Sequence, residues 1–135
     1  MNRVDTKDIE LIEAAKQMIR ARYKEGKHHV GAAVRTKSGK VYAAVNLEAY
    51  IGRVAVCAEA IALGKAISEG EDGFETIVAV LADEEGDARI VSPCGICREL
   101  ISDYGQEIHV LLPQGQEEYS KTGILELLPA KYKRE

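Results

Sequence analysis

With 135 residues, 46% of them hydrophobic and 30% charged, the chain can form one domain with a single buried core and has the composition of an ordinary globular protein. Its formal net charge of -4 argues against a nucleic-acid-binding protein, which usually carries a basic face, and favours a small substrate. No apolar run approaches the roughly 20 residues of a membrane span, and the polar N-terminus lacks a signal-peptide core. We therefore expect a cytoplasmic protein with a single domain over residues 1–135 and no membrane or nucleic-acid partner.

The predicted elements alternate between helices and strands. A helix begins at Asp5 and Thr6 and ends before Gly26, because apolar residues recur between these points at helical spacing. Two β-branched runs joined through Ser38-Gly39 then predict an antiparallel hairpin. The remaining predictions, in chain order, are strands over 30–34 and 41–45, a loop over 46–55, a helix over 56–68, a strand over 76–81, an acidic turn over 84–87, a short lead over 89–91 into Pro93, a helix over 95–104, a strand over 108–112, a polar loop over 113–123 and a helical turn over 124–128.

This order of elements predicts an α/β fold. Strands that alternate with helices late in the chain favour parallel pairing there, whereas the first two strands form an antiparallel hairpin. We expect one mixed sheet with helices on both faces, which is a three-layer arrangement. The charged residues around the hairpin are expected to form a solvated rim: Arg35, Lys37 and Lys40.

All three cysteines lie at or near predicted helix starts. Cys57 opens the second helix, and Cys94 and Cys97 open the third, where the helix dipole and free N–H groups favour thiolates. Cys-Gly-Ile-Cys has the spacing of a metal chelate, and a catalytic zinc takes three protein ligands and keeps its fourth position open. The sequence therefore predicts one Zn²⁺ per chain, held by these three cysteines.

Glu59 lies two residues after Cys57, close to the metal site without being forced to act as a ligand. Zinc lowers the pKa of a bound water to about 7. A neighbouring carboxylate can accept the proton that this water loses and return it to a leaving amine. A Cys-x-Glu element combined with Pro-Cys-x-x-Cys is the pattern of zinc nucleobase deaminases. Here these elements are Cys57-Ala58-Glu59 and Pro93-Cys94-Gly95-Ile96-Cys97, so we predict hydrolytic deamination with Glu59 as the general acid and base.

Other interpretations of these residues stay open. The cysteines could be buried hydrophobes, or could hold a structural zinc whose fourth ligand is His28, His29 or His109. Cys-Gly-Ile-Cys also resembles the motif of a thiol-disulfide oxidoreductase, although it comes late in the chain and leaves Cys57 unexplained. A non-catalytic domain that binds zinc or a ligand is the last alternative, although binding alone does not require Glu59.

The sequence resembles the cytidine deaminase family, including its blasticidin S deaminase branch, over nearly the whole chain. The matching segments are Val30-Gly31-Ala32-Ala33, Ser38-Gly39-Lys40-Val41-Tyr42, Asn46-Leu47-Glu48, Ser92-Pro93-Cys94-Gly95-Ile96-Cys97-Arg98 and Glu126-Leu127-Leu128-Pro129. The resemblance implies the three-layer fold of that family, a homotetramer with active sites near subunit interfaces, and a place in pyrimidine salvage.

The resemblance also implies roles for individual residues. Asn46 and Glu48 would hydrogen-bond the ribose hydroxyls, and the backbone around Ala58 would contact the base carbonyl. His28 stands where many members have a Phe whose ring faces the base. The expected reaction converts a cytidine-like nucleoside to the uridine-like product with release of ammonia, and the alternative substrate is a modified or aminoacylated cytosine nucleoside, as in the blasticidin branch.

Two departures from the family pattern concern the charge of the zinc site. Three thiolates and a divalent ion leave a net charge of about -1. The similar tetrameric enzymes usually have Arg where this chain has Ala60, and Gln where it has Glu99. Helix N-termini supply some positive charge. Arg53 is a candidate for supplying more, and a surface role in which it pairs with Glu48 is equally open.

Overall fold

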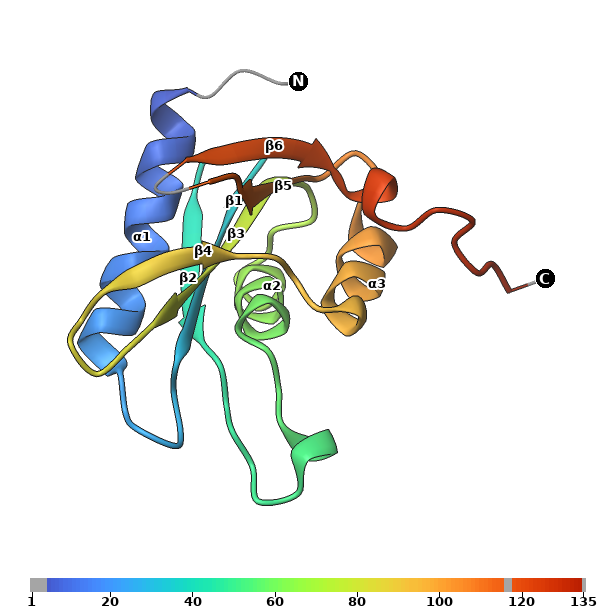
Figure 1. The fold of residues 1–135 in the computed structure, drawn as a ribbon. Helices are drawn as coiled ribbons and strands as arrows, with labels where there is room; N and C mark the ends of the chain where they lie inside the picture. Colours follow the sequence, from blue (N-terminus) through green and yellow to red (C-terminus); the bar gives the residue numbers. More distant parts are fainter. Residues whose placement is uncertain (1–4, 116–117, 135) are drawn as a thin grey trace.

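The computed structural model describes residues 5–115 and 118–134, so residues 1–4, 116–117 and 135 of the predicted domain lie outside the described part, two of them inside the predicted polar loop. The helices are α1 (Thr6–Arg22), α2 (Ala58–Ser68) and α3 (Gly95–Tyr104), with short 3-10 turns η1 (Gly52–Val54) and η2 (Ile124–Leu127) (Figure 1). The strands are β1 (Val30–Thr36), β2 (Val41–Val45), β3 (Phe74–Ala82), β4 (Ala88–Val91), β5 (His109–Pro113) and β6 (Tyr119–Gly123).

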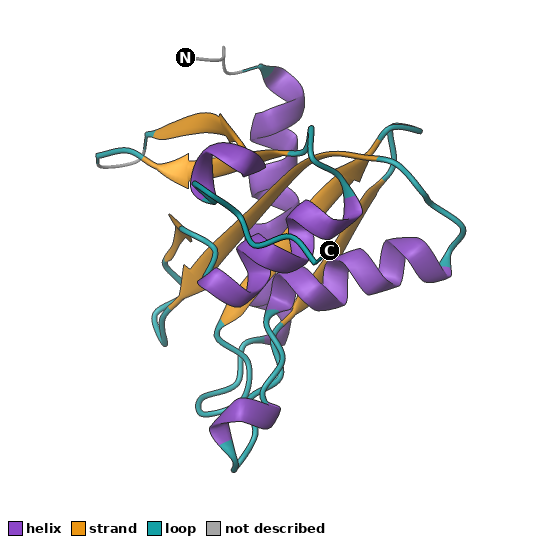
Figure 2. Ribbon diagram, turned by 90° about the vertical axis from the view of Figure 1, so that its right-hand side faces the viewer, coloured by secondary structure: helices purple, strands orange, loops and turns teal. Residues whose placement is uncertain are grey.

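The strands form one mixed sheet in the order β2-β1-β3-β5-β6. β1 is antiparallel to β2 and to β3, β5 is parallel to β3, and β4 pairs antiparallel with the last residues of β3. Helix α1 covers one face of the sheet, and α2 and α3 cover the other (Figures 1 and 2). The predicted mixed α/β fold, with its antiparallel hairpin and helices on both faces, is confirmed.

Successive side chains of the central strands enter two separate hydrophobic clusters. Ala32 and Ile77 pack with α2 and α3, whereas Ala33 and Val78 pack with α1. This follows from the two-residue period of a strand, which turns neighbouring side chains to opposite faces. Because α2 and α3 cover the same face, their N-termini can contribute side chains to one site.

The predicted polar loop over 113–123 is wrong for its second half. Tyr119–Gly123 forms β6, which pairs antiparallel with β5 at the edge of the sheet. An edge strand is half open to solvent and does not need the apolar alternation by which strands are recognised in a sequence. The segment over 89–91 is likewise part of a strand, β4, and the second helix begins at Ala58 with Cys57 as its N-cap.

The prediction of a solvated rim is wrong for Arg35. Its side chain is 7% exposed and lies 3.2 Å from the fully buried Asp8 of α1 and 2.9 Å from Glu75 of β3. A buried guanidinium needs such partners, because an unpaired buried charge is costly. Arg35 therefore joins α1 to the sheet.

None of the helices in residues 5–115 and 118–134 combines the length and the apolar character that crossing a membrane would require.

Candidate active site

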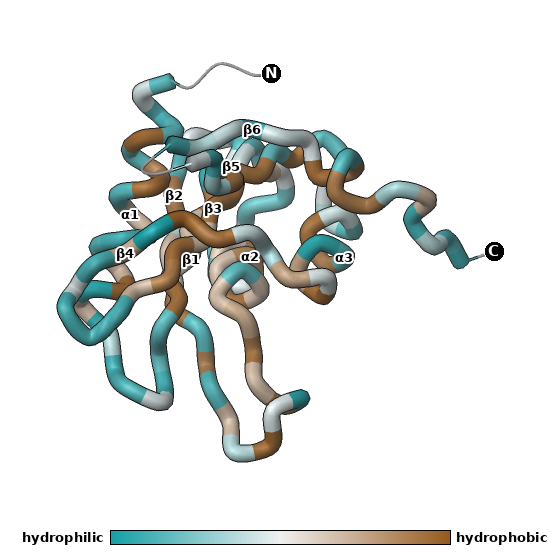
Figure 3. The backbone as a smooth tube through the Cα atoms, in the orientation of Figure 1, coloured by the Kyte–Doolittle hydropathy of each residue, from teal (hydrophilic) through white to brown (hydrophobic). Residues whose placement is uncertain are grey.

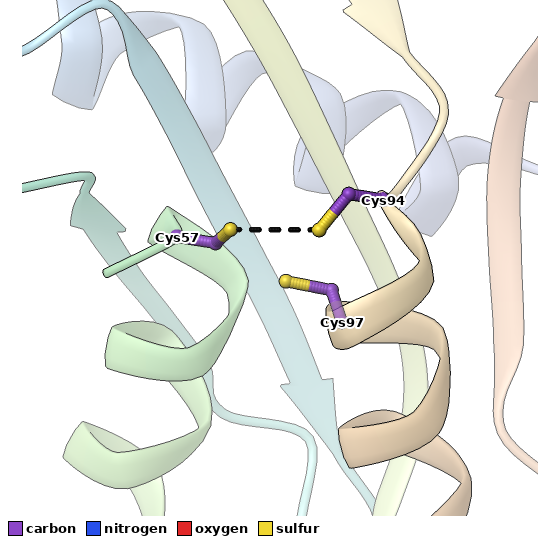
Figure 4. A group of neighbouring side chains, drawn as sticks. All are labelled: Cys57, Cys94 and Cys97. Carbon is purple, nitrogen blue, oxygen red and sulfur yellow. Dashed lines mark hydrogen bonds between the residues drawn. The ribbon is translucent and has the colours of Figure 1, made fainter. Parts of the chain in front are cut away.

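The three cysteines meet where the N-termini of α2 and α3 converge (Figure 4). Cys57 and Cys94 are the N-cap residues of these helices, and Cys97 lies in the first turn of α3. The Sγ atoms of Cys57 and Cys94 are 3.6 Å apart, and all three sulfurs lie within 4.8 Å of one another. None of the three forms a disulfide.

This cluster has the geometry and the donor set for a zinc ion. Zn–S bonds of about 2.3 Å at tetrahedral angles place two sulfurs roughly 3.8 Å apart, which the cluster can satisfy with small adjustments. Among the described residues no histidine, carboxylate or further cysteine joins the three sulfurs, so the structure provides no fourth ligand for a closed structural site. The cluster therefore fits a zinc site with one open position.

The three thiols differ in their electrostatic surroundings. Burial raises the pKa of the Cys57 thiol and of the fully buried Cys97 thiol. The pKa of Cys94 is lowered: its partial burial opposes ionisation, but the backbone N–H groups of Cys97 and Ile96 and the Cys57 thiol outweigh that effect. A bound divalent cation deprotonates coordinating thiols, including those that burial would otherwise keep neutral.

A cavity of about 380 Å³ opens beside the cysteines, which is a size suited to a small ligand. Its lining comes from β1, the loop between β2 and α2, the start of α2, the end of β4 and the start of α3. The lining residues are Val30, Asn46, Glu48, Gly52, Arg53, Ala55, Val56, Cys57, Ala58, Glu59, Val91, Ser92, Cys94 and Ile96. Most of the residues predicted for the site therefore share one cavity.

Glu59 is the most deeply buried carboxylate of this cavity, with 6% of its surface exposed. Burial raises the pKa of this group, although its own backbone N–H and the Cys97 thiol oppose the shift. A carboxyl group whose pKa moves toward neutrality can exchange protons more readily at physiological pH.

Asn46 is held in a single orientation at the edge of the cavity. Its Oδ1 accepts hydrogen bonds from the backbone N–H groups of His29 and Val30, at 2.8 and 3.0 Å. These bonds occupy the carbonyl oxygen of the side chain, so the amide nitrogen is the atom left to serve a ligand. Glu48 lies two residues further along, exposed on the same loop.

His28 does not line the cavity. Its Nδ1 lies 2.7 Å from the backbone oxygen of Asn46, so the ring supports the loop that carries Asn46 and Glu48. A direct contact between His28 and a substrate base stays a prediction.

Sequence reasoning missed the apolar wall of the cavity, which includes Val91 and Ile96. Val91 directly precedes the Ser92–Arg98 motif and Ile96 lies within it, so their positions in the sequence could have indicated that they lie near the site. Sequence reasoning also left open the partner of Glu99, which the structure shows to be Lys131: Glu99 Oε2 lies 3.3 Å from its Nζ. Lys131 also binds Asp103 of α3 at 3.1 Å. The charge of Glu99 is thus balanced at the C-terminal segment.

Comparisons with known proteins agree with this site. Residues 5–112 match the family described as the cytidine and deoxycytidylate deaminase zinc-binding region. Blasticidin-S deaminase from Bacillus cereus is 53% identical over 97% of this chain and 96% of its own length. Cytidine deaminase from Sporosarcina psychrophila is 34% identical over 93% of this chain and 90% of its own length. The crystal structure of cytidine deaminase from Burkholderia pseudomallei has a TM-score of 0.76 at 31% identity, covering 92% of this chain and 98% of that one.

The fold and the open three-cysteine site define a zinc-dependent hydrolytic deaminase that acts on nucleosides. More specifically, the chain belongs to the cytidine and deoxycytidylate deaminase family. The predicted family and zinc cofactor are confirmed, and the alternative of a thiol-disulfide oxidoreductase is not better supported.

Proposed function

We propose that this protein hydrolyses the exocyclic amine of a cytosine ring carried on a sugar, with release of ammonia. The observation that supports this most directly is that Glu59 lines the same cavity as Cys57 and Cys94, with Cys97 within reach of both sulfurs. A metal site with an open position, a buried carboxylate and a cavity the size of a small ligand are the parts that such a hydrolysis requires.

Each residue of the site has a task in the proposed reaction. Zinc, when bound, supplies the Lewis acidity that lets water act as a nucleophile near neutral pH. Glu59 takes one proton from this water and passes it to the ring nitrogen, and then takes the second proton from the same oxygen and passes it to the leaving amine. Oxygen from water thus replaces nitrogen on the ring carbon, and the nitrogen departs as ammonia. The backbone at Ala58 is proposed to contact the carbonyl of the base.

We assign the sugar to the loop between β2 and α2. The amide nitrogen of Asn46 can donate to a hydroxyl, because its Oδ1 is already bound to backbone N–H groups. The Glu48 carboxylate can accept from one or two hydroxyls. Both residues line the cavity, on a different segment from the cysteines, which supports the assignment of ring and sugar to its two ends.

A modified or aminoacylated cytosine nucleoside is the second candidate substrate. It is favoured by the 53% identity to blasticidin-S deaminase, compared with 34% to the cytidine deaminase from Sporosarcina psychrophila. Activity on cytidine would assign the reaction to pyrimidine salvage.

The experiment that tests the proposal measures ammonia release from cytidine, deoxycytidine, free cytosine and blasticidin S by zinc-loaded protein. We expect turnover of at least one of the three nucleosides and little or none of free cytosine. The ratio of kcat/KM for cytidine and blasticidin S decides between the two substrate classes. Absence of ammonia from all four compounds would contradict the proposed function.

We further propose that the protein is a cytoplasmic homotetramer. The loop that projects from the sheet and carries η1 includes hydrophobic positions along its backbone (Figure 3). Five large apolar or aromatic side chains of this loop are exposed: Leu47, Tyr50, Ile51, Val54 and Val56. Large exposed apolar patches mark association surfaces, and the three free thiols suit a reducing compartment. Analytical ultracentrifugation should give the mass of four chains, and a monomer at micromolar concentration would contradict the assembly.

A further inference from the structure

Arg98 directly follows Cys97 in α3, and its side chain reaches back to the segment that carries Cys94. Its Nε donates a hydrogen bond to the backbone oxygen of Pro93 at 2.9 Å, and its Nη1 lies 3.5 Å from the backbone oxygen of Leu127 in η2. The residue is half-buried. One guanidinium therefore joins the segment before α3 to the 3-10 turn near the C-terminus.

The bond to Pro93 replaces one that the backbone does not make. Pro93 is buried, and across residues 5–115 and 118–134 no backbone N–H donates to its carbonyl oxygen. A buried carbonyl group without a hydrogen-bond partner is costly, so the segment needs a donor from elsewhere. The side chain of Arg98 supplies that donor.

Arg98 holds the backbone on both sides of Cys94. Its side chain binds the oxygen of the peptide group before Cys94, and its own backbone N–H donates to the oxygen of the peptide group after it, at 2.9 Å. This matters because Cys94 is exposed, whereas Cys97 is fixed by full burial in the first turn of α3. The two bonds from Arg98 therefore fix the direction in which the Cys94 side chain leaves the backbone.

We propose that Arg98 is a positioning residue of the zinc site, which holds the peptide group before Cys94 so that the Cys94 sulfur is in place for the metal. Zinc requires its sulfur ligands at tetrahedral separations, and a loosely held ligand must be ordered when the metal binds. Groups that orient metal ligands without touching the metal typically change its affinity by about 10- to 100-fold. This role concerns the metal site alone and does not depend on which nucleoside the protein deaminates.

Two substitutions separate the hydrogen bond from the charge of Arg98. Arg98→Gln and Arg98→Met both remove the positive charge and the contact with Leu127. Glutamine, however, carries an N–H donor at the position of Nε, where methionine has a methyl group. Zinc affinity is measured without substrate, by competition with a chelator. Arg98→Met should bind zinc about 10- to 100-fold more weakly than the native protein, and Arg98→Gln should stay close to the native affinity.

Lys131→Gln is the matched control. It also removes a link between α3 and the C-terminal segment, namely the ion pairs with Glu99 and Asp103, but it does not touch Pro93. Its zinc affinity should equal that of the native protein. A loss in Lys131→Gln as large as that in Arg98→Met would overturn the proposal, because general loosening of the C-terminal segment would then be the cause.

Cobalt(II) in place of zinc provides a second measurement, because its sulfur-to-metal charge-transfer band reports the bound thiolates. This band should weaken in Arg98→Met and keep its native intensity in Arg98→Gln, and it decides the test if Arg98→Met folds only with metal. Native zinc affinity or a native cobalt spectrum in Arg98→Met would overturn the proposal. Equal losses in Arg98→Met and Arg98→Gln would also overturn it, because the charge or the Leu127 contact would then be responsible.

Discussion

Glu59 can be separated from the cysteines by substitution, because it lines the cavity without joining the three-sulfur group. Glu59→Gln keeps the size and polarity of the side chain but cannot accept or return a proton. We expect zinc content to stay near one per chain while kcat falls by about 10²- to 10⁴-fold, the usual contribution of a general acid or base. Metal analysis and ammonia release on the same preparation provide the check. Turnover close to the native rate would remove Glu59 from the proton transfers.

Glu48 offers a cleaner test of the sugar site than Asn46. Asn46→Ala would also remove two hydrogen bonds to backbone N–H groups, so its effect would mix binding with the shape of the loop. Glu48→Gln weakens one exposed acceptor and should lower kcat/KM for nucleosides by about 10-fold or more. Any weak activity on free cytosine should hardly change. Equal losses on nucleoside and free base would mean that Glu48 does not contact the sugar.

At this scale the sequence predicted the residues that belong to short motifs. Cys57, Glu59 and the Cys94–Cys97 pair follow from local spacing, because the chemistry needs them at fixed separations along the chain. The ion pairs Arg35–Asp8 and Lys131–Glu99 could not be predicted. Their members lie far apart in the sequence, and only the folded arrangement decides which charge reaches which.

At the scale of the elements, α1 and β1 approach each other closely at Gly31. A Cβ built there would lie 2.5 Å from the backbone oxygen of Ala15 and 2.9 Å from Cβ of Ile19. Gly31→Ala must therefore push α1 away from the sheet, and overpacking of this kind costs about 1–3 kcal/mol. Thermal unfolding should show a lower Tm.

Gly64→Ala is the matched control, because a Cβ at this position in α2 meets nothing within 4 Å. Alanine is the better helix former, so this change should leave Tm unchanged or raise it slightly. A Tm for Gly31→Ala equal to that of the native protein would contradict the close packing of α1 on β1.

Glu71 joins the segment after α2 to the β1–β2 hairpin. Its carboxylate accepts hydrogen bonds from Ser38 at 2.9 and 3.1 Å and from Tyr42 at 3.0 Å. The Ser38 bond, with help from Tyr42, holds the pKa of Glu71 below its ordinary value of 4.5, although desolvation opposes this. A lowered pKa means that the stabilisation is complete above the unfolded-state value and is lost as pH falls through the folded-state value.

Glu71→Gln should therefore lower Tm at pH 7, and it should make little difference at an acidic pH below the folded-state pKa of Glu71, where the native carboxyl is also protonated. Paired melting curves at the two pH values measure this. A Tm difference between native protein and variant that does not shrink in acid would show that the Glu71 charge does not hold the hairpin.

The buried helices and strands were predictable because the pattern of apolar residues along the sequence indicates which segments are buried. The three helices repeat apolar residues at helical spacing, and β1 and β3 are mostly apolar runs buried on both faces, so their positions agree with prediction to within a few residues. β6 was not predicted from the sequence, because its residues, Tyr-Ser-Lys-Thr-Gly, lie at the edge of the sheet and are all half-buried. This segment is a strand because it pairs with β5, and its own sequence has no apolar alternation that would predict a strand.

Across the whole molecule, zinc would join two helices that belong to distant parts of the chain. Cys57 caps α2, Cys94 caps α3, and a strand pair separates them in the sequence. A metal bound by both helices favours the folded chain over the unfolded one, because the unfolded chain has no formed site. Stability and activity should therefore depend on the same ion.

The measurement that tests the account most directly is ammonia release as a function of zinc content, with preparations that range from chelator-stripped to fully loaded. We predict that turnover of the best cytosine nucleoside rises in proportion to bound zinc and levels off at about one zinc per chain. Tm should rise over the same range, and Cys94→Ala should show neither increase. Full turnover by zinc-free protein, or zinc binding that changes neither turnover nor Tm, would contradict the assignment of this chain as a zinc-dependent deaminase.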